Sequence, residues 1–401
     1  MHIRDFKRTF IYHSPQYPGY TSWCGLWNMP DKSVMLSCTE ATGPIYGRPK
    51  APADIRKKLD WPPQGCISDK DKYERYDMTG LDFQNIHLRS IDFGLSWEKV
   101  SGDHFQTCMN GVTCEPEAAL DDGTILRGVW GPYLPYNDVS YDGYIQRSND
   151  GSCSWGEPEI ISKNKAFMFW PRRIRVLRDG RVLAGGGLFR KNPKLNTRMG
   201  WFKDMTQVLF VSGDNGYSWN GPIEITPRNQ QKEFAGEEFD WVELDNGDLL
   251  IVLRCETLPT FDTKDPGQDR RQTRLIKKGN SWLPTHVEMA PFPHSGHPEM
   301  LKTKEGVIFH FATSGISWST NEGESWADIE IPELCLTQVN CGRKMKDKLV
   351  VSGTAYYPRS VQMSNGEILC VGHIGGDDAY GEVDQSIVAV RFFVEKGILK
   401  K

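Results

Sequence analysis

The sequence has few features of a protein that binds a polyanion or spans a membrane. Basic and acidic residues nearly balance, 48 against 52, and no cluster of Lys and Arg offsets the net charge of −4, so we expect no nucleic-acid partner. No apolar run approaches the roughly 18 residues that a membrane-spanning helix needs. The N-terminus, MHIRDFKRTF, alternates charged with apolar residues and has no secretory signal core. As it stands, the sequence predicts a cytoplasmic protein with no membrane partner; it would be periplasmic or secreted if a leader had been removed.

The sequence also lacks the cysteine and histidine spacings of a structural metal site. Its ten cysteines include no Cys-x-x-Cys pair and no paired histidines at zinc-site spacing. His294 and His297 could ligate a metal ion, but no third ligand follows at a recognisable spacing. We therefore predict no bound metal and no cofactor. The cysteines are expected to be mostly reduced, although two pairs could close small loops in an oxidising compartment, Cys108 with Cys114 and Cys335 with Cys341.

Tryptophan and glycine are abundant instead, at 13 and 39 residues, which is typical of a turn-rich β protein. Two series of motifs repeat along the chain. The first is Ser-x-Asp-x-Gly-x-Ser-Trp, with exact or weaker copies at residues 90–97, 148–155, 212–219, 277–282 and 319–326. The second is an Asp-Gly or Asn-Gly turn before an apolar strand, with exact or degenerate copies near residues 30, 121, 178, 245, 304 and 364. Six turns of the second kind imply six structural units.

These repeats predict an all-β fold. An Asp-Gly or Asn-Gly hairpin is expected to place both central residues at positive φ. The short polar side chains of the Ser-x-Asp turn can bind amides of their own loop while the Trp packs between sheets. Each unit then contains four antiparallel strands. We predict one domain over residues 1–401, a six-bladed β-propeller of four-stranded antiparallel blades, in which a strand near residues 8–13 completes the last blade.

The long connections are expected at one face of this propeller. In a four-stranded meander the first and third turns lie at the same face, and here these are the short repeated turns. The second turn and the link between blades lie at the other face, where long insertions are predicted at residues 41–87, 98–116, 186–206 and 255–272. Because binding residues concentrate on loops held by a rigid scaffold, we expect the site where first strands begin and second strands end.

The Ser-x-Asp-x-Gly-x-Ser-Trp turns resemble the Asp boxes, or BNR repeats, of the sialidase (neuraminidase) superfamily. Members of that superfamily are six-bladed β-propeller glycosidases, so the resemblance implies a hydrolase of carbohydrate metabolism. It spans about residues 85 to 395. Asp boxes also stabilise turns in propellers of other function, so they imply the fold more strongly than the chemistry.

Two further segments resemble catalytic segments of the superfamily. EEFDWVELDNGDLLIVLR (237–254) is similar to the segment in which a glutamate opens a first strand and an arginine closes the second. By this match Glu238 would activate the nucleophile and Arg254 would grip the substrate carboxylate. GTAYYPRSVQMSNGEIL (353–369) resembles the region of the nucleophilic tyrosine, which makes Tyr357 the first candidate and Tyr356 the next. A Tyr–Glu pair suits attack on an anomeric centre that already carries a carboxylate.

The first blade departs from the superfamily pattern. Where the superfamily has an Arg-Ile-Pro type strand that supplies the first arginine, this sequence reads PGYTSWCGLW (18–27), without arginine. Arg172 also lies at an expected strand end, but the candidates that we take for substrate binding besides Arg254 are Arg127, Arg173, Arg359 and Tyr356. For the acid/base residue the sequence offers three carboxylates at suitable blade ends, Glu40, Glu115 and Glu117.

The leading hypothesis is an exo-acting, sialidase-like glycoside hydrolase on an acidic, carboxylate-bearing glycan or oligosaccharide. Tyr357 would be the nucleophile, Glu238 its base and Arg254 the carboxylate clamp. The insertion at 41–87 would wall the pocket and restrict it to chain ends.

Histidines on the expected working face support an alternative. His297 and His373 lie there together with Tyr357 and Arg254. Such a set could remove the C5 proton of a uronate and protonate the leaving oxygen, which is the chemistry of a uronate-directed polysaccharide lyase. A third hypothesis is a non-catalytic glycan-binding propeller, which the missing first arginine favours.

Overall fold

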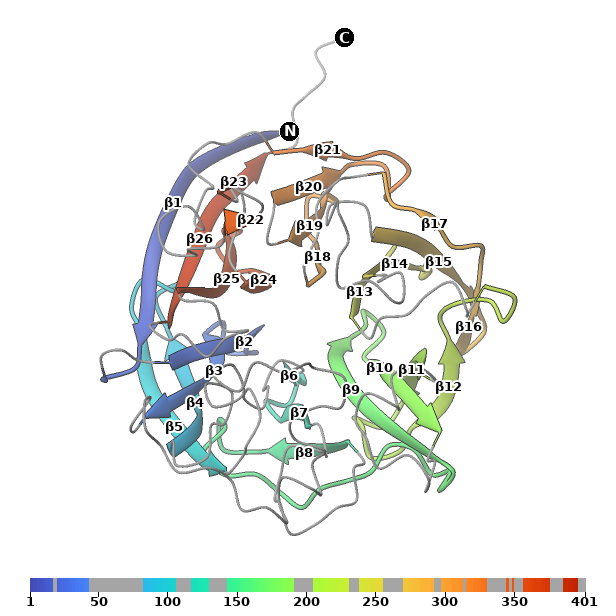
Figure 1. The fold of residues 1–401 in the computed structure, drawn as a ribbon, viewed down its shortest axis with the longest axis horizontal. Coiled ribbons are helices and arrows are strands. Elements are labelled where there is room, and N and C mark those ends of the chain that lie inside the picture. The colour runs from blue at the N-terminus through green and yellow to red at the C-terminus, as the bar shows by residue number, and fades with distance from the viewer. Residues whose placement is uncertain are drawn as a thin grey trace.

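The computed structural model is a ring of six β-sheets around a central axis (Figure 1). It describes residues 1–16, 20–42, 82–105, 117–129, 143–190, 205–230, 238–254, 270–291, 297–312, 315–329, 344–345, 348–349, 356–375 and 385–395. Within these ranges all regular secondary structure is β-strand, apart from turns. The predicted six-bladed β-propeller is confirmed.

The blades follow one another in chain order, and each blade begins at the axis. Blade 1 contains β2 (Tyr20–Asn28), β3 (Val34–Thr42), β4 (Asp82–Ser90) and β5 (Glu98–Phe105). Blade 2 contains β6 (Glu117–Ala119), β7 (Ile125–Val129) and β8 (Tyr144–Ser148), and Glu159 forms a bridge to Ile145 in place of a fourth strand. Blade 3 contains β9 (Phe167–Val176), β10 (Val182–Arg190), β11 (Met205–Ser212) and β12 (Asn220–Glu224).

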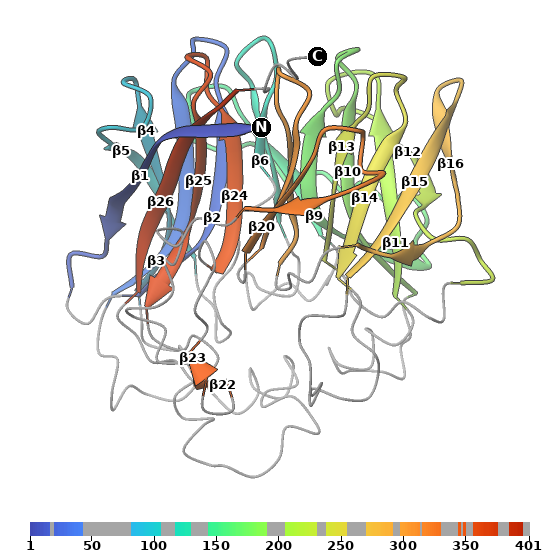
Figure 2. The same ribbon diagram turned by 90° about the horizontal axis from the view of Figure 1, so that it is seen from above.

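The remaining blades complete the ring. Blade 4 contains β13 (Phe239–Glu243), β14 (Leu249–Arg254), β15 (Arg270–Lys278) and β16 (Ser281–Pro284), with β17 (Glu288–Met289) also paired to β15. Blade 5 contains β18 (Glu299–Lys302), β19 (Ile308–Ala312), β20 (Gly315–Ser319) and β21 (Ala327–Asp328). Blade 6 contains β24 (Tyr356–Gln362), β25 (Ile368–Gly375), β26 (Gln385–Glu395) and β1 (His2–His13). A separate hairpin, β22 (Lys344–Met345) and β23 (Lys348–Leu349), lies apart from the ring (Figure 2).

The N-terminal strand closes the ring, as the sequence predicted. β1 pairs antiparallel with β26 from His2 opposite Glu395 to His13 opposite Ser386, so it forms the outer edge of blade 6. Tyr12 on this strand donates a hydrogen bond to Glu40 on β3 of blade 1. The first and last segments of the chain are thereby joined, which removes the open seam of the ring.

The predicted insertions are shorter than expected where the structure describes their ends. β3 and β4 extend into the 41–87 segment from both sides, and residues 43–81 lie outside the described residues. The segment from residue 98 is not an insertion, because β5 supplies the fourth strand of blade 1. The cysteine pairs 108/114 and 335/341 also lie outside the described residues, whereas Cys24, Cys38, Cys153 and Cys370 are thiols and not disulfides.

Strand β14 shows why the second strands are continuously apolar. Its sequence LLIVLR has five successive buried residues. Leu249, Ile251 and Leu253 pack into a cluster that includes blade 3, whereas Leu250 and Val252 pack with Ile308 of blade 5. Alternate side chains of one strand point to opposite faces of the sheet, and in a propeller both faces meet another blade.

The two repeated turns have distinct geometries. In each described Ser-x-Asp turn the serine hydroxyl accepts the amide four residues later; Gly216 N lies 2.7 Å from Ser212 Oγ. Asp214 then accepts the amide of Ser218 at 2.8 Å. The Asp-Gly hairpins differ from our expectation, because only the glycine has positive φ; Gly247 has φ 85° and its amide binds Leu244 O at 2.9 Å. They are therefore type I turns followed by a left-handed glycine.

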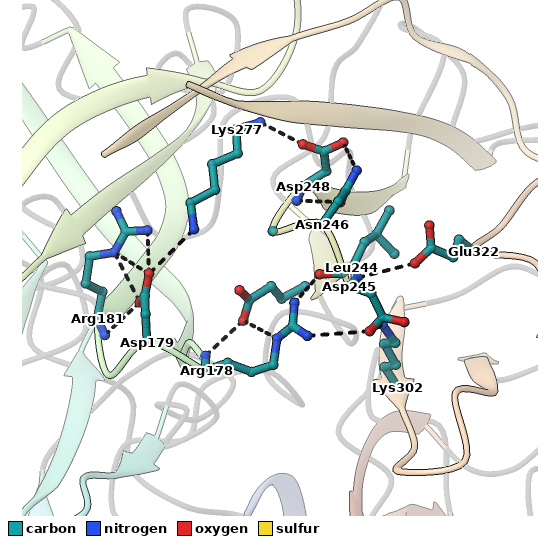
Figure 3. A network of polar contacts seen from close by, with 12 residues as sticks. Arg178, Asp179, Arg181, Leu244, Asp245, Asn246, Asp248, Lys277, Lys302 and Glu322 are labelled. Carbon is teal, nitrogen blue, oxygen red and sulfur yellow. Dashed lines mark hydrogen bonds and ion pairs between the residues drawn. The ribbon is translucent and has the colours of Figure 1, made fainter. Parts of the chain in front are cut away.

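Ion pairs join these hairpins from blade to blade at the turn face, as Figure 3 shows. The amide of Arg178 between β9 and β10 binds Glu243, and its guanidinium reaches Asp245 in the next blade at 3.5 Å. Asp245 is also 2.5 Å from Lys302 Nζ of blade 5. Pairs of this kind with at least one exposed partner stabilise only modestly, and here they connect the hairpins of successive blades.

Candidate active site

Glu238 and Arg254 face each other across the β13–β14 pair at the end away from the hairpin. The amide of Arg254 donates to Glu238 O at 2.9 Å, which places the residues opposite one another. Arg254 Nη1 lies 2.5 Å from Glu238 Oε2. This is where a first strand begins and a second strand ends, the position that the sequence predicted for the site.

His297 connects this pair to the next blade. It lies two residues before β18, is buried, and its Nδ1 is 3.5 Å from Glu238 Oε2. Its ring centroid is 5.1 Å from that of Tyr357 on β24. Three successive blades therefore contribute Glu238, His297 and Tyr357 to one contiguous cluster.

Tyr357 projects from a β-bulge. The pairing of β24 with β25 shifts between Tyr356 and Arg359, and Tyr357 has φ 49°, a left-handed conformation that is uncommon for an aromatic residue. Its half-buried ring stacks on His373 with 5.9 Å between centroids and 14° between planes. The side chain of Tyr356 lies outside the described part of the chain. The bulge re-aims Tyr357 so that both predicted histidines contact one tyrosine.

Trp23 closes the cluster from blade 1. It also lies in a bulge, between Ser22 and Gly25 of β2, with φ 48°. Its ring meets Tyr357 and His373 edge-on, each with centroids 6.4 Å apart, and its amide donates to His373 Nδ1 at 3.4 Å. This bond makes Nδ1 an acceptor and therefore puts the proton of neutral His373 on Nε2.

The electrostatics of the cluster centre on Glu238. Burial raises the pKa of its carboxyl, but Arg254, His297 and Arg172 outweigh burial and hold that pKa well below its usual range. Glu238 is thus a carboxylate at neutral pH. Two arginines act on this one carboxylate, so the described cluster has an excess of positive charge.

The other predicted arginines lie elsewhere. Arg173 pairs with Asp240 and Glu299, and Arg359 lies 3.7 Å from Glu299, all buried near the axis. Arg127 pairs with Asp103 at 2.7 Å and stacks over Trp155 in blades 1 and 2. Two of the carboxylates considered for acid/base chemistry are engaged in buried hydrogen bonds, Glu40 with Tyr12 and Glu117 with Ser37 and His87, and Glu115 lies outside the described residues.

Sequence reasoning gave too little weight to Arg172 and missed Trp23. The Pro-Arg-Arg run of β9 shows that arginines are present, but a register shift between Gly185 and Gly186 decides which one faces Glu238. Trp23 lies in the segment where the superfamily's first arginine was sought. Its position in an apolar strand that lacks arginine was the only available signal.

Within the described residues, no group of three or more His, Cys, Asp or Glu side chains is arranged to hold a metal ion. In the same part of the chain, no helix has the length and hydropathy to span a membrane.

Comparison with solved structures supports the fold over nearly the whole chain. An α-L-arabinofuranosidase from Fusarium graminearum superposes with a TM-score of 0.58 at 12% identity, covering 96% of both chains. An α-L-arabinanase from Penicillium chrysogenum gives 0.58 at 13%, covering 96% of this chain and 97% of its own. An intramolecular trans-sialidase from Ruminococcus gnavus gives 0.55 at 10%, also covering 96% and 97%. No protein-family model matches the chain. No curated protein sequence matches it either.

Proposed function

We propose that the protein is a glycoside hydrolase that acts on the end of a carboxylate-bearing glycan. The observation that carries the proposal is the chain of contacts from Tyr357 through His297 to Glu238 and Arg254. The solved structures of similar fold include an α-L-arabinanase and an intramolecular trans-sialidase, which supports a glycosidase in general.

In this mechanism Tyr357 attacks the anomeric carbon, and the bond to the glycosidic oxygen breaks; that oxygen leaves with its aglycone and takes a proton from solvent. The phenolic proton passes to His297, whose Nδ1 is oriented by the Glu238 carboxylate. A water then attacks the anomeric carbon and releases one proton to solvent, while the glycosyl–tyrosine bond breaks and His297 returns its proton to the tyrosine oxygen. This arrangement differs from a direct Tyr–Glu pair, because an imidazole contacts both partners.

The excess positive charge supports an acidic sugar. Arg254 binds Glu238 through Nη1 and its side chain is 33% exposed, so its guanidinium charge lies where a substrate carboxylate could approach. Arg172 adds a second positive charge beside the same carboxylate. The substrate carboxylate would thus bind beside Arg254, with Trp23 standing where the superfamily places another arginine.

A uronate lyase is the second candidate, favoured by the two histidines that contact Tyr357. One group would remove the C5 proton while another protonates the leaving oxygen. Because Trp23 donates to Nδ1 of His373, Nε2 is the nitrogen through which this imidazole would exchange a proton with the substrate.

The test is a screen of wild type and Tyr357→Phe against aryl sialosides, aryl uronides, aryl arabinofuranosides and uronate oligosaccharides. We expect aglycone release from an acidic glycoside, reduced about 1,000-fold or more in the variant. Tyr217→Phe is the matched control, because Tyr217 lies exposed in a Ser-x-Asp turn beneath Arg147.

Growth of an unsaturated-uronate absorbance without hydrolysis would transfer the assignment to the lyase. Release from arabinofuranosides alone would contradict the acidic substrate, and saturable binding without turnover would identify a glycan-binding propeller.

A further inference from the structure

A second tier of charged side chains lies next to the candidate site on the inner strands of blades 4 and 5. Asp240 on β13 follows Glu238, the residue just before that strand, by two positions. Glu299, the first residue of β18, follows His297 by two positions. We call Glu238, His297 and Tyr357 the upper tier, and Asp240 and Glu299 the lower tier.

Each lower-tier carboxylate reaches the backbone of the next blade. Asp240 Oδ2 accepts the amide of Met300 on β18 at 2.7 Å. Glu299 Oε1 accepts the amide of Ser360 on β24 at 2.7 Å and the Ser360 hydroxyl at 2.8 Å. The first strand of a blade is an edge strand, whose outward amides have no ladder partner within their own sheet. The carboxylates satisfy these amides and so join β13 to β18 and β18 to β24.

These hydrogen bonds between blades set the spacing of the upper-tier residues. Asp240 holds β18, which follows His297, against β13, which follows Glu238. Glu299 in turn holds β24, which contains Tyr357, against β18. A shift of β18 relative to β13 would change the Glu238–His297 distance of 3.5 Å, and a shift of β24 relative to β18 would change the His297–Tyr357 contact.

The lower tier is neutralised by arginines. Arg173 contacts both carboxylates, and Arg175 binds Asp240 and the carbonyl of Met300. Burial raises the pKa of Asp240, but Arg173 and Arg175 outweigh it, so the pKa is lowered. Burial raises the pKa of Glu299, with Asp240 acting in the same direction. Removing one carboxylate therefore leaves a buried excess of positive charge.

We propose that Glu299 is a positioning residue of the site, which fixes Tyr357 against His297 and sets the protonation of His297 through its negative charge. The proposal rests on the proposed function only for its catalytic consequence. Asp240 plays the same part for His297 and Glu238.

Charged and titratable side chains from several described elements surround the two residues. His297 is faced by Glu238 beside β13 and Tyr357 on β24, with Arg254, Arg172 and His373 also in the upper cluster. Glu299 is faced by Arg173 and Arg175 of β9, Asp240 of β13, Arg359 of β24 and the Cys370 thiol of β25. The substitution that changes least besides the charge is Glu299→Gln, because an amide oxygen can still accept from Ser360.

The experiment is an NMR titration of the His297 ring in wild type and Glu299→Gln. We expect the His297 midpoint to fall by roughly one pH unit, because a nearby negative charge that favours the protonated ring is removed. Glu367→Gln is the control: Glu367 is also buried against an arginine, Arg391, but lies beside the β24–β25 hairpin at the other end of the strands. It should leave the midpoint unchanged.

An unchanged His297 midpoint in folded Glu299→Gln would overturn the proposal, as would an equal shift in Glu367→Gln. If Glu299→Gln does not fold, Asp240→Asn serves as the second variant, with a shift in the same direction expected. The titration needs no substrate. If the midpoint shifts in Glu299→Gln but the wild type hydrolyses no glycoside, the proposed function is refuted and the positioning role remains intact. Where activity is found, Glu299→Gln should lower kcat more than it raises KM and move the acid limb of the pH profile downward.

Discussion

At the scale of single residues, Glu238 shows how opposing effects set the chemistry of a buried carboxyl. Burial disfavours its charge, whereas Arg254, His297 and Arg172 favour it and prevail. The carboxylate is consequently ionised but weakly basic. This property suits a group that orients His297 better than one that takes a proton from Tyr357 itself.

Replacing Arg254 with Gln should weaken this balance. Without the guanidinium, one of the groups that lower the pKa of Glu238 is lost and that pKa rises, so the acid limb of kcat/KM moves to higher pH. Arg254→Lys is the matched control, because it retains the charge and should keep the limb near its wild-type position while weakening binding of a planar carboxylate. A pH–rate profile measures both variants, and an unmoved limb in Arg254→Gln would show that Glu238 does not control activity.

At the scale of elements, the Ser-x-Asp turns form the same hydrogen-bonded loop in four blades. The copy with displaced glycine places Ser152 at φ 72°, and the copy with Asn321 binds the amide of Ser325 at 3.0 Å. In the aspartate turns, hydrogen bonds from serine lower the pKa of the carboxyl; that of Asp214 falls to about 2, chiefly through Ser218. These bonds are local, which is why the motif could be recognised from sequence.

The lowered pKa of Asp214 predicts a pH-dependent contribution to stability. A depressed carboxyl pKa stabilises the fold above its unfolded value, 3.8, and the stabilisation is lost as pH falls toward about 2. Asp214→Asn should therefore be less stable than wild type at neutral pH, and the difference should shrink across that window. Denaturant titrations at several pH values measure it. Asn321→Asp should introduce the same dependence in blade 5, and a constant difference for Asp214→Asn would contradict the explanation.

At this scale the sequence predicted the turns between strands but not the β-bulges. Repeated turn residues marked the blades, and strand ends indicated where Glu238 and Arg254 would lie. The bulges at Trp23 and Tyr357 left no sequence signature, because they depend on pairing with a partner strand. Similarly, the type I geometry of the hairpins depends on the hydrogen bonds across the turn and not on the Asp-Gly pair alone.

At the scale of the whole molecule, stability depends on closing the ring. β1 covers the edge of β26, and Tyr12 extends the closure to Glu40 of blade 1. Without this strand, blade 6 would expose a long apolar edge that includes Val388, Val390 and Phe392.

Deleting residues 1–13 should thus lower the thermal midpoint and cause aggregation. Tyr12→Phe, which removes only the contact to Glu40, should produce a smaller loss. Arg4→Gln is the control on the same strand, because its pairs with Asp5 and Glu395 are exposed and contribute little. Thermal unfolding and light scattering measure the series, and a deletion variant as stable as wild type would mean that the ring closes without β1.

The sequence by itself determined the architecture, since turn chemistry and strand alternation act over a few residues and repeat six times. It also supplied the residues of the candidate site at the correct strand ends. Only the tertiary structure decided which of them meet, because His297 and Glu238 come from different blades and each contact depends on strand register, bulges and the curvature of the ring. For the same reason Arg172 acts on Glu238 whereas Arg173 pairs with Asp240 and Glu299, and these two carboxylates join blades that no local pattern connects.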